Sequence, residues 1–146
     1  MAEGDRPSVL FLDANILMYA VGKEHPYREP CRAILRRIAL DELIVVTNVE
    51  VLQELLHRYR SLGKPDLASA LYAATKDLCE EVFAVTVEDL DRAHEILGAS
   101  SSDLSVRDAV HAATSLRRGI EEILSTDQHF ESVEGITRVD PTAVAR

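Results

Sequence analysis

The chain has 146 residues, of which 47% are apolar, and its formal net charge is −9. This length fits one domain, predicted to span residues 1–146, and the apolar fraction is ample for a buried core. The negative charge excludes indiscriminate binding to polyanions, because phosphate contacts need positive charge, so a nucleic-acid substrate would have to be attracted by local arginines and a metal ion.

The N-terminal sequence and the two cysteines narrow the class of protein further. The chain does not open on a basic region followed by a long apolar stretch, and no later apolar run is long enough to span a bilayer. We therefore expect a soluble, cytoplasmic protein. Cys31 and Cys79 form no CxxC motif and have no neighbouring histidine, so we expect small buried residues rather than zinc ligands or a disulfide.

Short β-type runs alternate with helical stretches along the chain. The first run, residues 9–12, is fully apolar, which is typical of a buried parallel strand. Further strands are predicted at residues 43–46, 82–87, 123–125 and, more weakly, 136–139. This alternation predicts an α/β fold with three layers, α/β/α, around a central parallel sheet of about five strands.

Apolar residues at helical spacing predict the helices between these strands. They cover about residues 27–38, 49–62, 65–78, 87–97 and 106–118, the second and third forming a hairpin. The expected N-terminal caps are Asn48, Thr86 with Asp89, and Ser105 with Asp108. Helix ends are expected at Gly63, Gly98 and Gly119.

Four acidic residues follow or begin these predicted elements. Asp13 ends the first apolar run, Asp127 follows another, Glu54 lies on a helix and Asp108 opens one. In open α/β sheets, the crevice beyond the carboxyl ends of the strands is the usual ligand site. Chain order therefore places these acids toward one end of the sheet.

Each acid also has a structural explanation when it is considered alone. Asp13 and Asp127 suit helix caps or turns, and Asp108 suits the first turn of a helix. Glu54 suits an ion pair with Arg58, four residues on. Glu50 lies one turn before Glu54 on the same face, so periodicity alone leaves both open for a catalytic role.

Considered together, the four acids predict a metal site. Repulsion among clustered carboxylates must be offset, and Mg²⁺ and Mn²⁺ prefer oxygen ligands supplied by a few carboxylates and a substrate phosphate. The sequence has no GxSxG, GxxxxGK[ST] or GxGxxG motif that would indicate other catalytic machinery.

Three polar residues beside these acids have open roles. Asn15 would either cap a helix that begins at residue 16 or bind a metal-bound water. Thr126 would orient Asp127 or contact a phosphate, with turn formation as its structural role. His111 lies one turn after Asp108 on an apolar helix, where a packing role is expected.

With these residues assembled, the chain resembles PIN-domain proteins, specifically the VapC toxins of toxin–antitoxin modules. The resemblance covers nearly the whole chain and rests on four ordered motifs: FLDANILMY at Asp13, VLQEL at Glu54, LSVRDAVHAA at Asp108 and LSTDQHF at Asp127. The QEL context favours Glu54 over Glu50.

The resemblance implies an endoribonuclease dependent on Mg²⁺ or Mn²⁺, with Asp13, Glu54, Asp108 and Asp127 as its acidic quartet. Asn15 and Thr126 match supporting positions, and Asp103 is a candidate extra ligand. It also implies a homodimer and a small VapB-like antitoxin whose arginine enters the acidic site. Candidate arginines for RNA or dimer contacts, most of them expected on solvated helix faces, are Arg36, Arg37, Arg58, Arg60, Arg117 and Arg118.

The sequence is also compatible with three other classes of protein. A haloacid-dehalogenase-like phosphatase would need a second Asp where Asn15 stands, and a receiver domain would need a phosphoacceptor Asp near Thr86 and Val87. A non-catalytic PIN-like scaffold that binds RNA or protein is the third. Metal-dependent RNA cleavage separates a nuclease from all three.

Overall fold

Five parallel strands form a single sheet in the computed structural model, which describes residues 8–100 and 103–145. Within these residues the strand order is β3-β2-β1-β4-β5. The strands are β1 (Val9–Leu12), β2 (Ile44–Asn48), β3 (Glu81–Phe83), β4 (Glu122–Leu124) and β5 (Thr137–Val139). The helices are α1 (Ala14–Val21), α2 (Arg28–Ala39), α3 (Val49–Ser61), α4 (Pro65–Leu78), α5 (Val87–Ala99), α6 (Val106–Arg117), α7 (Pro141–Val144) and the 3₁₀ helix η2 (Gln128–Ser132).

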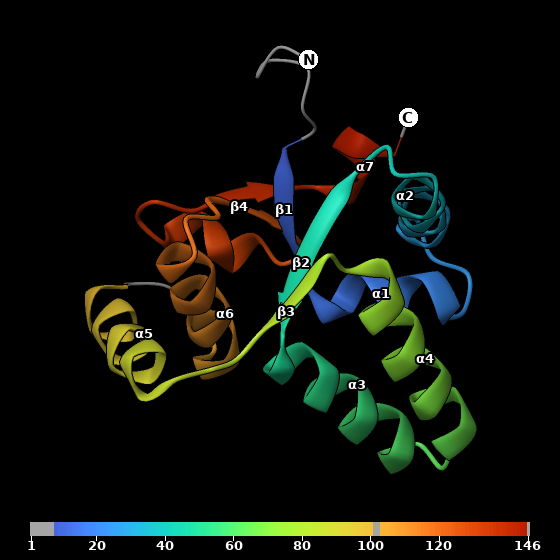
Figure 1. Cartoon of the computed structure of the whole chain (residues 1–146), viewed down its shortest axis with the longest axis horizontal. Helices are drawn as coiled ribbons and strands as arrows, with labels where there is room; N and C mark the ends of the chain where they lie inside the picture. The colour runs from blue at the N-terminus through green and yellow to red at the C-terminus, as the bar shows by residue number, and fades with distance from the viewer. Residues whose placement is uncertain (1–7, 101–102, 146) are drawn as a thin grey trace.

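Helices pack around this sheet in pairs: α1 with α2, α3 with α4, and α5 with α6. In Figure 1 the α5–α6 pair lies on one side of the sheet and the α1–α2 pair on the opposite side. The predicted α/β fold with a parallel sheet of five strands flanked by helices is confirmed.

The central strand β1 is buried because it pairs on both edges. Phe11 lies opposite Val46 of β2 and Ile123 of β4, and its side chain is fully buried. Parallel strands bring their carboxyl ends to one edge of the sheet, so the residues that follow β1 and β4, together with the last residue of β2, meet there.

Side-chain caps begin the helices at this edge. Asn48 accepts a hydrogen bond from the Val51 amide at the start of α3, and Ser105 accepts one from the Asp108 amide at the start of α6. Thr86 and Asp89 form the predicted capping box of α5. These local bonds satisfy amide groups that have no partner inside the helix.

The structure corrects three local predictions. The strand predicted at residues 82–87 ends at Phe83, because Thr86 leaves the sheet to cap α5. Asp13, rather than Asn15, caps α1, and Asn15 lies in the first turn of that helix. Gly98 lies inside α5 instead of ending it.

The remaining sequence predictions concern cysteines, one loop and membrane spans. Cys31 and Cys79 are buried and free, as predicted. Residues 101 and 102 of the predicted serine-rich loop, like residues 1–7 at the N-terminus, lie outside the described residues. Across the part of the chain that is described, every helix is too short or too polar to cross a membrane.

Candidate metal site

Asp13 lies at the carboxyl end of β1, where the fold buries its carboxylate. Its Oδ1 accepts from the Ala14 amide at 2.8 Å, and its Oδ2 accepts from the Ser125 hydroxyl at 2.7 Å and from the Asn15 amide at 3.1 Å. Burial raises the pKa of Asp13 against the opposing effects of His111 and of the hydrogen bonds from Ser125 and Ala14. Ionisation of Asp13 in the folded protein therefore costs free energy.

Ser125 connects the acids at the ends of β1 and β4. Besides donating to Asp13, its Oγ accepts from the backbone amide of Asp127 at 3.0 Å and from Asn15 Nδ2 at 3.1 Å. Asn15 also accepts from the Thr126 amide at 3.3 Å. The side chain of Asn15 and the backbone of Thr126 thus hold the two strand ends together.

Asp108 and Asp127 form a coupled pair of carboxyl groups. The pKa of Asp108, in the first turn of α6, is raised by burial, by a hydrogen bond with Asp127 and by the negative charge of Asp13. The hydrogen bond with Asp108 lowers the pKa of Asp127, and the His129 amide, at 2.9 Å, lowers it further. Within this pair the proton is therefore favoured on Asp108 over Asp127.

Glu54 joins this group, whereas Glu50, one turn earlier on α3, is linked to it through Arg107. Glu54 Oε1 lies 3.9 Å from His111 Nε2, and the charge of Glu54 raises the pKa of both Asp13 and Asp108. Arg107 reaches both glutamates, with Nη1 3.3 Å from Glu54 and Nε 3.7 Å from Glu50. The structure therefore brings Asp13, Glu54, Asp108 and Asp127 together.

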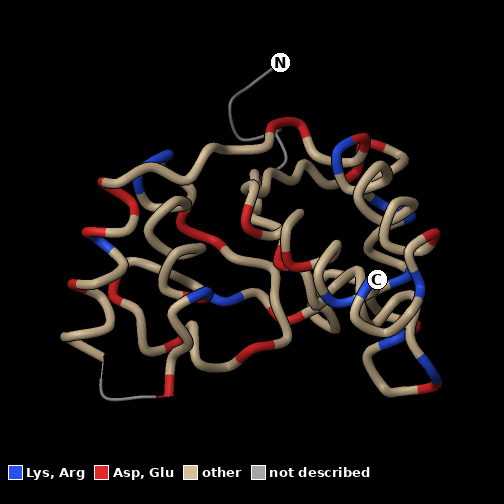
Figure 2. The backbone as a smooth tube through the Cα atoms, turned by 90° about the horizontal axis from the view of Figure 1, so that it is seen from below, with Lys and Arg blue, Asp and Glu red and all other residues tan. Residues whose placement is uncertain are grey.

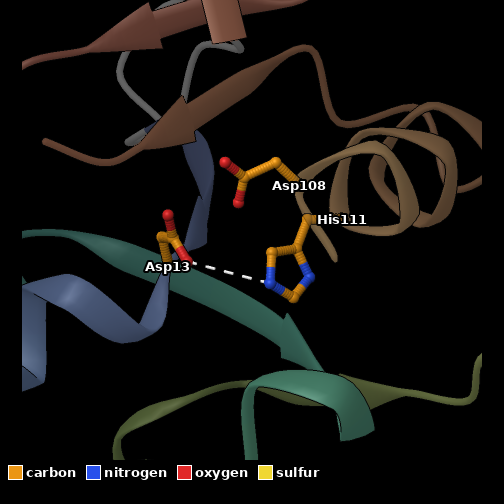
Figure 3. A group of neighbouring side chains, drawn as sticks. All are labelled: Asp13, Asp108 and His111. Atoms are coloured by element: carbon orange, nitrogen blue, oxygen red, sulfur yellow. Dashed lines mark ion pairs between the residues drawn. The ribbon is translucent and has the colours of Figure 1, made fainter. Parts of the chain in front are cut away.

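Asp103 lies apart from this set. It is exposed in the segment that precedes α6, and the compact group of possible metal ligands found among the described residues does not include it. That group consists of Asp13, Asp108 and His111, whose ligand-type atoms lie within 4.8 Å of one another (Figure 3), and Glu54 and Asp127 lie outside it as well.

His111 is buried as a packing residue, as predicted, but its position beside the acids was not anticipated from the sequence. Its ring is fully buried, its centroid lies 5.3 Å from that of Phe11, and its Nε2 lies 3.8 Å from Asp13 Oδ1. Figure 3 shows the ring beside Asp13 and one turn of α6 beyond Asp108. The i, i+3 spacing from Asp108 was the available signal, since such residues share a helix face.

Arginine positions also differ from the sequence expectation. Arg107, absent from the predicted set, lies at the acid cluster. Arg117 instead donates to buried Asp89, and Arg118 pairs with Glu81 and lies 4.1 Å above the Phe83 ring. Arg117 and Arg118 are therefore engaged in contacts within the chain.

The chemistry of this donor set fits a divalent cation. Several carboxylates repel one another in a buried setting, and Glu54 Oε1 is among the buried polar atoms of the described residues that lack a hydrogen-bond partner. A cation would offset that repulsion and satisfy that oxygen. The buried Asp/Asp/His cluster could thus bind a metal ion.

Comparison with known families agrees with this fold. The model of the family described as PIN domain matches residues 10–136, which is most of the chain. The chain therefore belongs to the PIN-domain family.

Two curated relatives define the branch of this family. Ribonuclease VapC7 of Mycobacterium tuberculosis is 32% identical over 136 residues, covering 92% of this chain and 93% of that protein. Ribonuclease VapC13 of the same species is 31% identical over 131 residues, covering 90% and 99%. Within the PIN domains, the chain belongs with the VapC ribonucleases, the toxins of VapBC toxin–antitoxin systems.

Solved structures share the fold at lower identity. The DNA-bound VapBC complex of Salmonella typhimurium matches with a TM-score of 0.70 and 17% identity, over 92% of this chain and 98% of that one. VapC20 of Mycobacterium tuberculosis, described as a sarcin-ricin loop cleaving toxin, matches with a TM-score of 0.66 and 22% identity, over 83% and 91%.

Proposed function

We propose that this chain is an endoribonuclease that depends on Mg²⁺ or Mn²⁺ and hydrolyses RNA phosphodiester bonds at the acid cluster. The observation that carries the proposal is the convergence of Asp13, Glu54, Asp108 and Asp127 from separate elements onto one site, where Asp13 and Asp108 are buried and Glu54 and Asp127 are partly exposed. Buried carboxylates that repel one another are destabilising for the fold, so a functional reason for keeping them is needed.

The proposed roles of the four acids follow from their surroundings. Asp13 and Asp108, the more buried pair, would hold the principal ion, and Glu54 and Asp127 would complete its coordination or hold a second one. Such an ion supplies an activated water and stabilises the charge of the leaving oxygen. Ser125 and Asn15 fix one oxygen of Asp13, so its carboxylate keeps a single orientation.

Individual basic side chains, rather than a positive net charge, would bind the RNA. Acidic and basic positions are interspersed along the backbone in Figure 2, and the chain carries 16 Lys and Arg against 25 Asp and Glu. Arg107 is the arginine that contacts the acid cluster in the described structure, through Glu50 and Glu54. Its guanidinium, about half exposed beside Glu54, would be able to bind a phosphate of the RNA.

The experiment that tests this function compares two glutamates on the same face of α3. Purified protein is incubated with defined structured RNAs and Mg²⁺, Mn²⁺ or chelator. Asp13→Asn, Asp108→Asn and Glu54→Gln are expected to lower cleavage at least about 100-fold, as loss of metal coordination does, whereas Glu50→Gln is expected to retain it.

The outcomes of this experiment separate the alternative functions. Cleavage that survives chelator, or that is equal in wild type and the folded Asp13→Asn variant, would refute the proposal and favour a binding scaffold. An acyl phosphate trapped on Asp13 would instead identify a phosphoaspartate enzyme. Asn15 stands two residues after Asp13 and hydrogen-bonds its carboxylate, which leaves no second carboxylate at that position.

The proposed partner is a small VapB-like antitoxin. Solved structures that share this fold include VapBC2 from Rickettsia felis and FitAcB from Neisseria gonorrhoeae. In this chain a groove of about 830 Å³ runs beside α1, α3 and the start of α4 and reaches Thr126 and Asp127. Met18, Tyr59 and Leu62 provide apolar lining, so an antitoxin segment seated there could place an arginine at the acids.

A homodimer is the assembly that we propose for the free toxin. The first turns of α5 expose two apolar side chains on one helix face, Val87 at 71% and Leu90 at 51%. Exposed aliphatic residues spaced three apart are typical of a helix face that packs against a partner.

A further inference from the structure

The orientation of the Asn48 amide is set by the helix that follows it. Asn48 is the last residue of β2 and the cap of α3, and its Oδ1 accepts from the Val51 amide at 3.0 Å. The amide nitrogen must therefore occupy the other branch of the side chain. That branch faces His111 Nδ1 at 3.1 Å and Thr114 Oγ1 at 3.4 Å, and all three side chains are fully buried.

This amide decides which ring nitrogen of His111 carries the proton. An NH₂ group only donates hydrogen bonds, so His111 Nδ1 must accept and the ring proton must lie on Nε2. Thr114 Oγ1 donates its own hydrogen to the Val110 carbonyl at 2.8 Å, which leaves it free to accept the second hydrogen of Asn48. Every hydrogen in this network then has an acceptor except the one on Nε2.

That remaining hydrogen points into the acid cluster. His111 Nε2 lies 3.8 Å from Asp13 Oδ1 and 3.9 Å from Glu54 Oε1, slightly beyond hydrogen-bond range. In the described structure both Nε2 and Glu54 Oε1 are buried without a hydrogen-bond partner. A movement of about 1 Å would join them.

We propose that His111 is a positioning residue that donates Nε2–H to the carboxylates of Asp13 and Glu54, and is not itself a metal ligand. A nitrogen that carries a proton has no lone pair for a cation, so the centre is built from oxygen ligands alone. Such a centre selects Mg²⁺ or Mn²⁺ over Zn²⁺, which imidazole ligands favour. This inference rests on the proposed metal-dependent function and adds how the ion is selected.

The first experiment observes the tautomer directly. Nitrogen-15 NMR of the imidazole ring distinguishes Nε2–H from Nδ1–H, and diamagnetic Mg²⁺ and Zn²⁺ are added in turn to the full chain. We expect His111 to show Nε2–H in the free protein and with either ion. A proton on Nδ1 in the free protein, or transfer to Nδ1 when Mg²⁺ binds, would overturn the proposal.

The second experiment uses matched variants and metal affinity measured by calorimetry. His111→Gln keeps a side-chain N–H donor and is expected to bind Mn²⁺ within about 3-fold of wild type, whereas His111→Leu is expected to lose about 10-fold or more. Asn48→Asp retains the cap but places an acceptor against Nδ1, so it should move the proton there and raise Zn²⁺ affinity at least about 10-fold.

These readouts separate this inference from the proposed function. His111→Gln that loses Mn²⁺ binding as severely as His111→Leu would show that the imidazole is a ligand. If the tautomer and metal affinities are as expected but no RNA is cleaved, the positioning role stands and the nuclease proposal falls. Circular dichroism on each variant establishes that it is folded.

Discussion

At the level of single residues, the environment of the buried acids Asp13 and Asp108 lowers the free energy of unfolding at neutral pH. Burial raises the pKa of Asp13 and Asp108, while the hydrogen bond with Asp108 lowers the pKa of Asp127. A raised pKa means that the folded state binds protons more tightly than the unfolded chain. Protonation of Asp13 and Asp108 makes its full contribution to stability below the ordinary pKa of 3.8. This contribution is lost as the pH rises through the raised pKa values of the two residues.

Asp108→Asn tests this cost. The amide can still donate to Asp127 but no longer titrates, so the variant should match wild type near pH 4 and be more stable at pH 8. We expect a difference of at least about 1 kcal/mol, which corresponds to roughly one unit of pKa difference between the folded and unfolded states. Urea unfolding in chelator between pH 4 and 8 measures it.

The control for this prediction is exposed Asp103, whose replacement by Asn should leave the pH profile of wild type unchanged. Parallel profiles for wild type and Asp108→Asn would contradict the prediction.

Adding Mn²⁺ at about 100 times its dissociation constant should raise the stability of wild type by about 2.7 kcal/mol and that of Asp108→Asn by much less.

At the level of elements, α6 carries Asp108 and His111 and is anchored at its far end to α5. Asp89 is 1% exposed and accepts from Arg117 Nε at 2.6 Å, from Arg117 Nη2 at 3.1 Å and from the Thr86 amide at 2.9 Å. The pKa of Asp89 is lowered because the hydrogen bonds from Arg117 and Thr86 outweigh the effect of burial. This carboxylate thus closes the capping box and joins the two helices.

Asp89→Ala should lower the free energy of unfolding by about 2–3 kcal/mol, since it removes the carboxylate half of the capping box and the partner of Arg117. Chemical denaturation measures the loss, and Asp91→Ala, an exposed position on the same helix, should change stability by less than about 0.5 kcal/mol. In the double variant with Arg117→Met, the combined loss should be smaller than the sum of the single losses. Additive losses would show that the ion pair is not the connection.

At the level of the whole molecule, the groove beside α1, α3 and α4 places an open surface next to the acids. It includes Leu62, which is 54% exposed at the end of α3, and it extends to Asp127. Leu40, at the end of α2, is 68% exposed and does not line this groove. The two leucines therefore form a matched pair for locating the antitoxin.

We expect the small protein encoded beside this gene to copurify with the chain and to suppress RNA cleavage. Leu62→Glu should weaken that binding at least about 10-fold because it places a charge in an apolar contact, whereas Leu40→Glu should not change it. Titration calorimetry measures both affinities, and light scattering of the free toxin tests the homodimer. If the antitoxin binds Leu62→Glu and Leu40→Glu with equal affinity, it does not bind in this groove.

Sequence by itself determined those features that depend on near neighbours in the chain. Apolar runs and helical spacing predicted the strands and helices, since backbone pairing and burial follow these periods. Asn48, Ser105 and the Thr86–Asp89 pair were predicted as caps, because each cap bonds to an amide within three residues. Asp13 and Asp127 were expected at one edge because strand ends in parallel sheets meet there, whereas the preference for Glu54 over Glu50 came from the family resemblance.

Only the tertiary structure decided which of those local features are also parts of the site. Glu50 and Glu54 share one face of α3, and they are distinguished by distances to His111 and Arg107 of α6, which local periodicity does not contain. Asn48 is a cap by local rule, yet its second function depends on a ring 63 residues later in the chain. Contacts between distant segments arise from packing of the whole sheet and its helices. The environment of His111 is therefore determined by the tertiary structure and cannot be deduced from its neighbours in the chain.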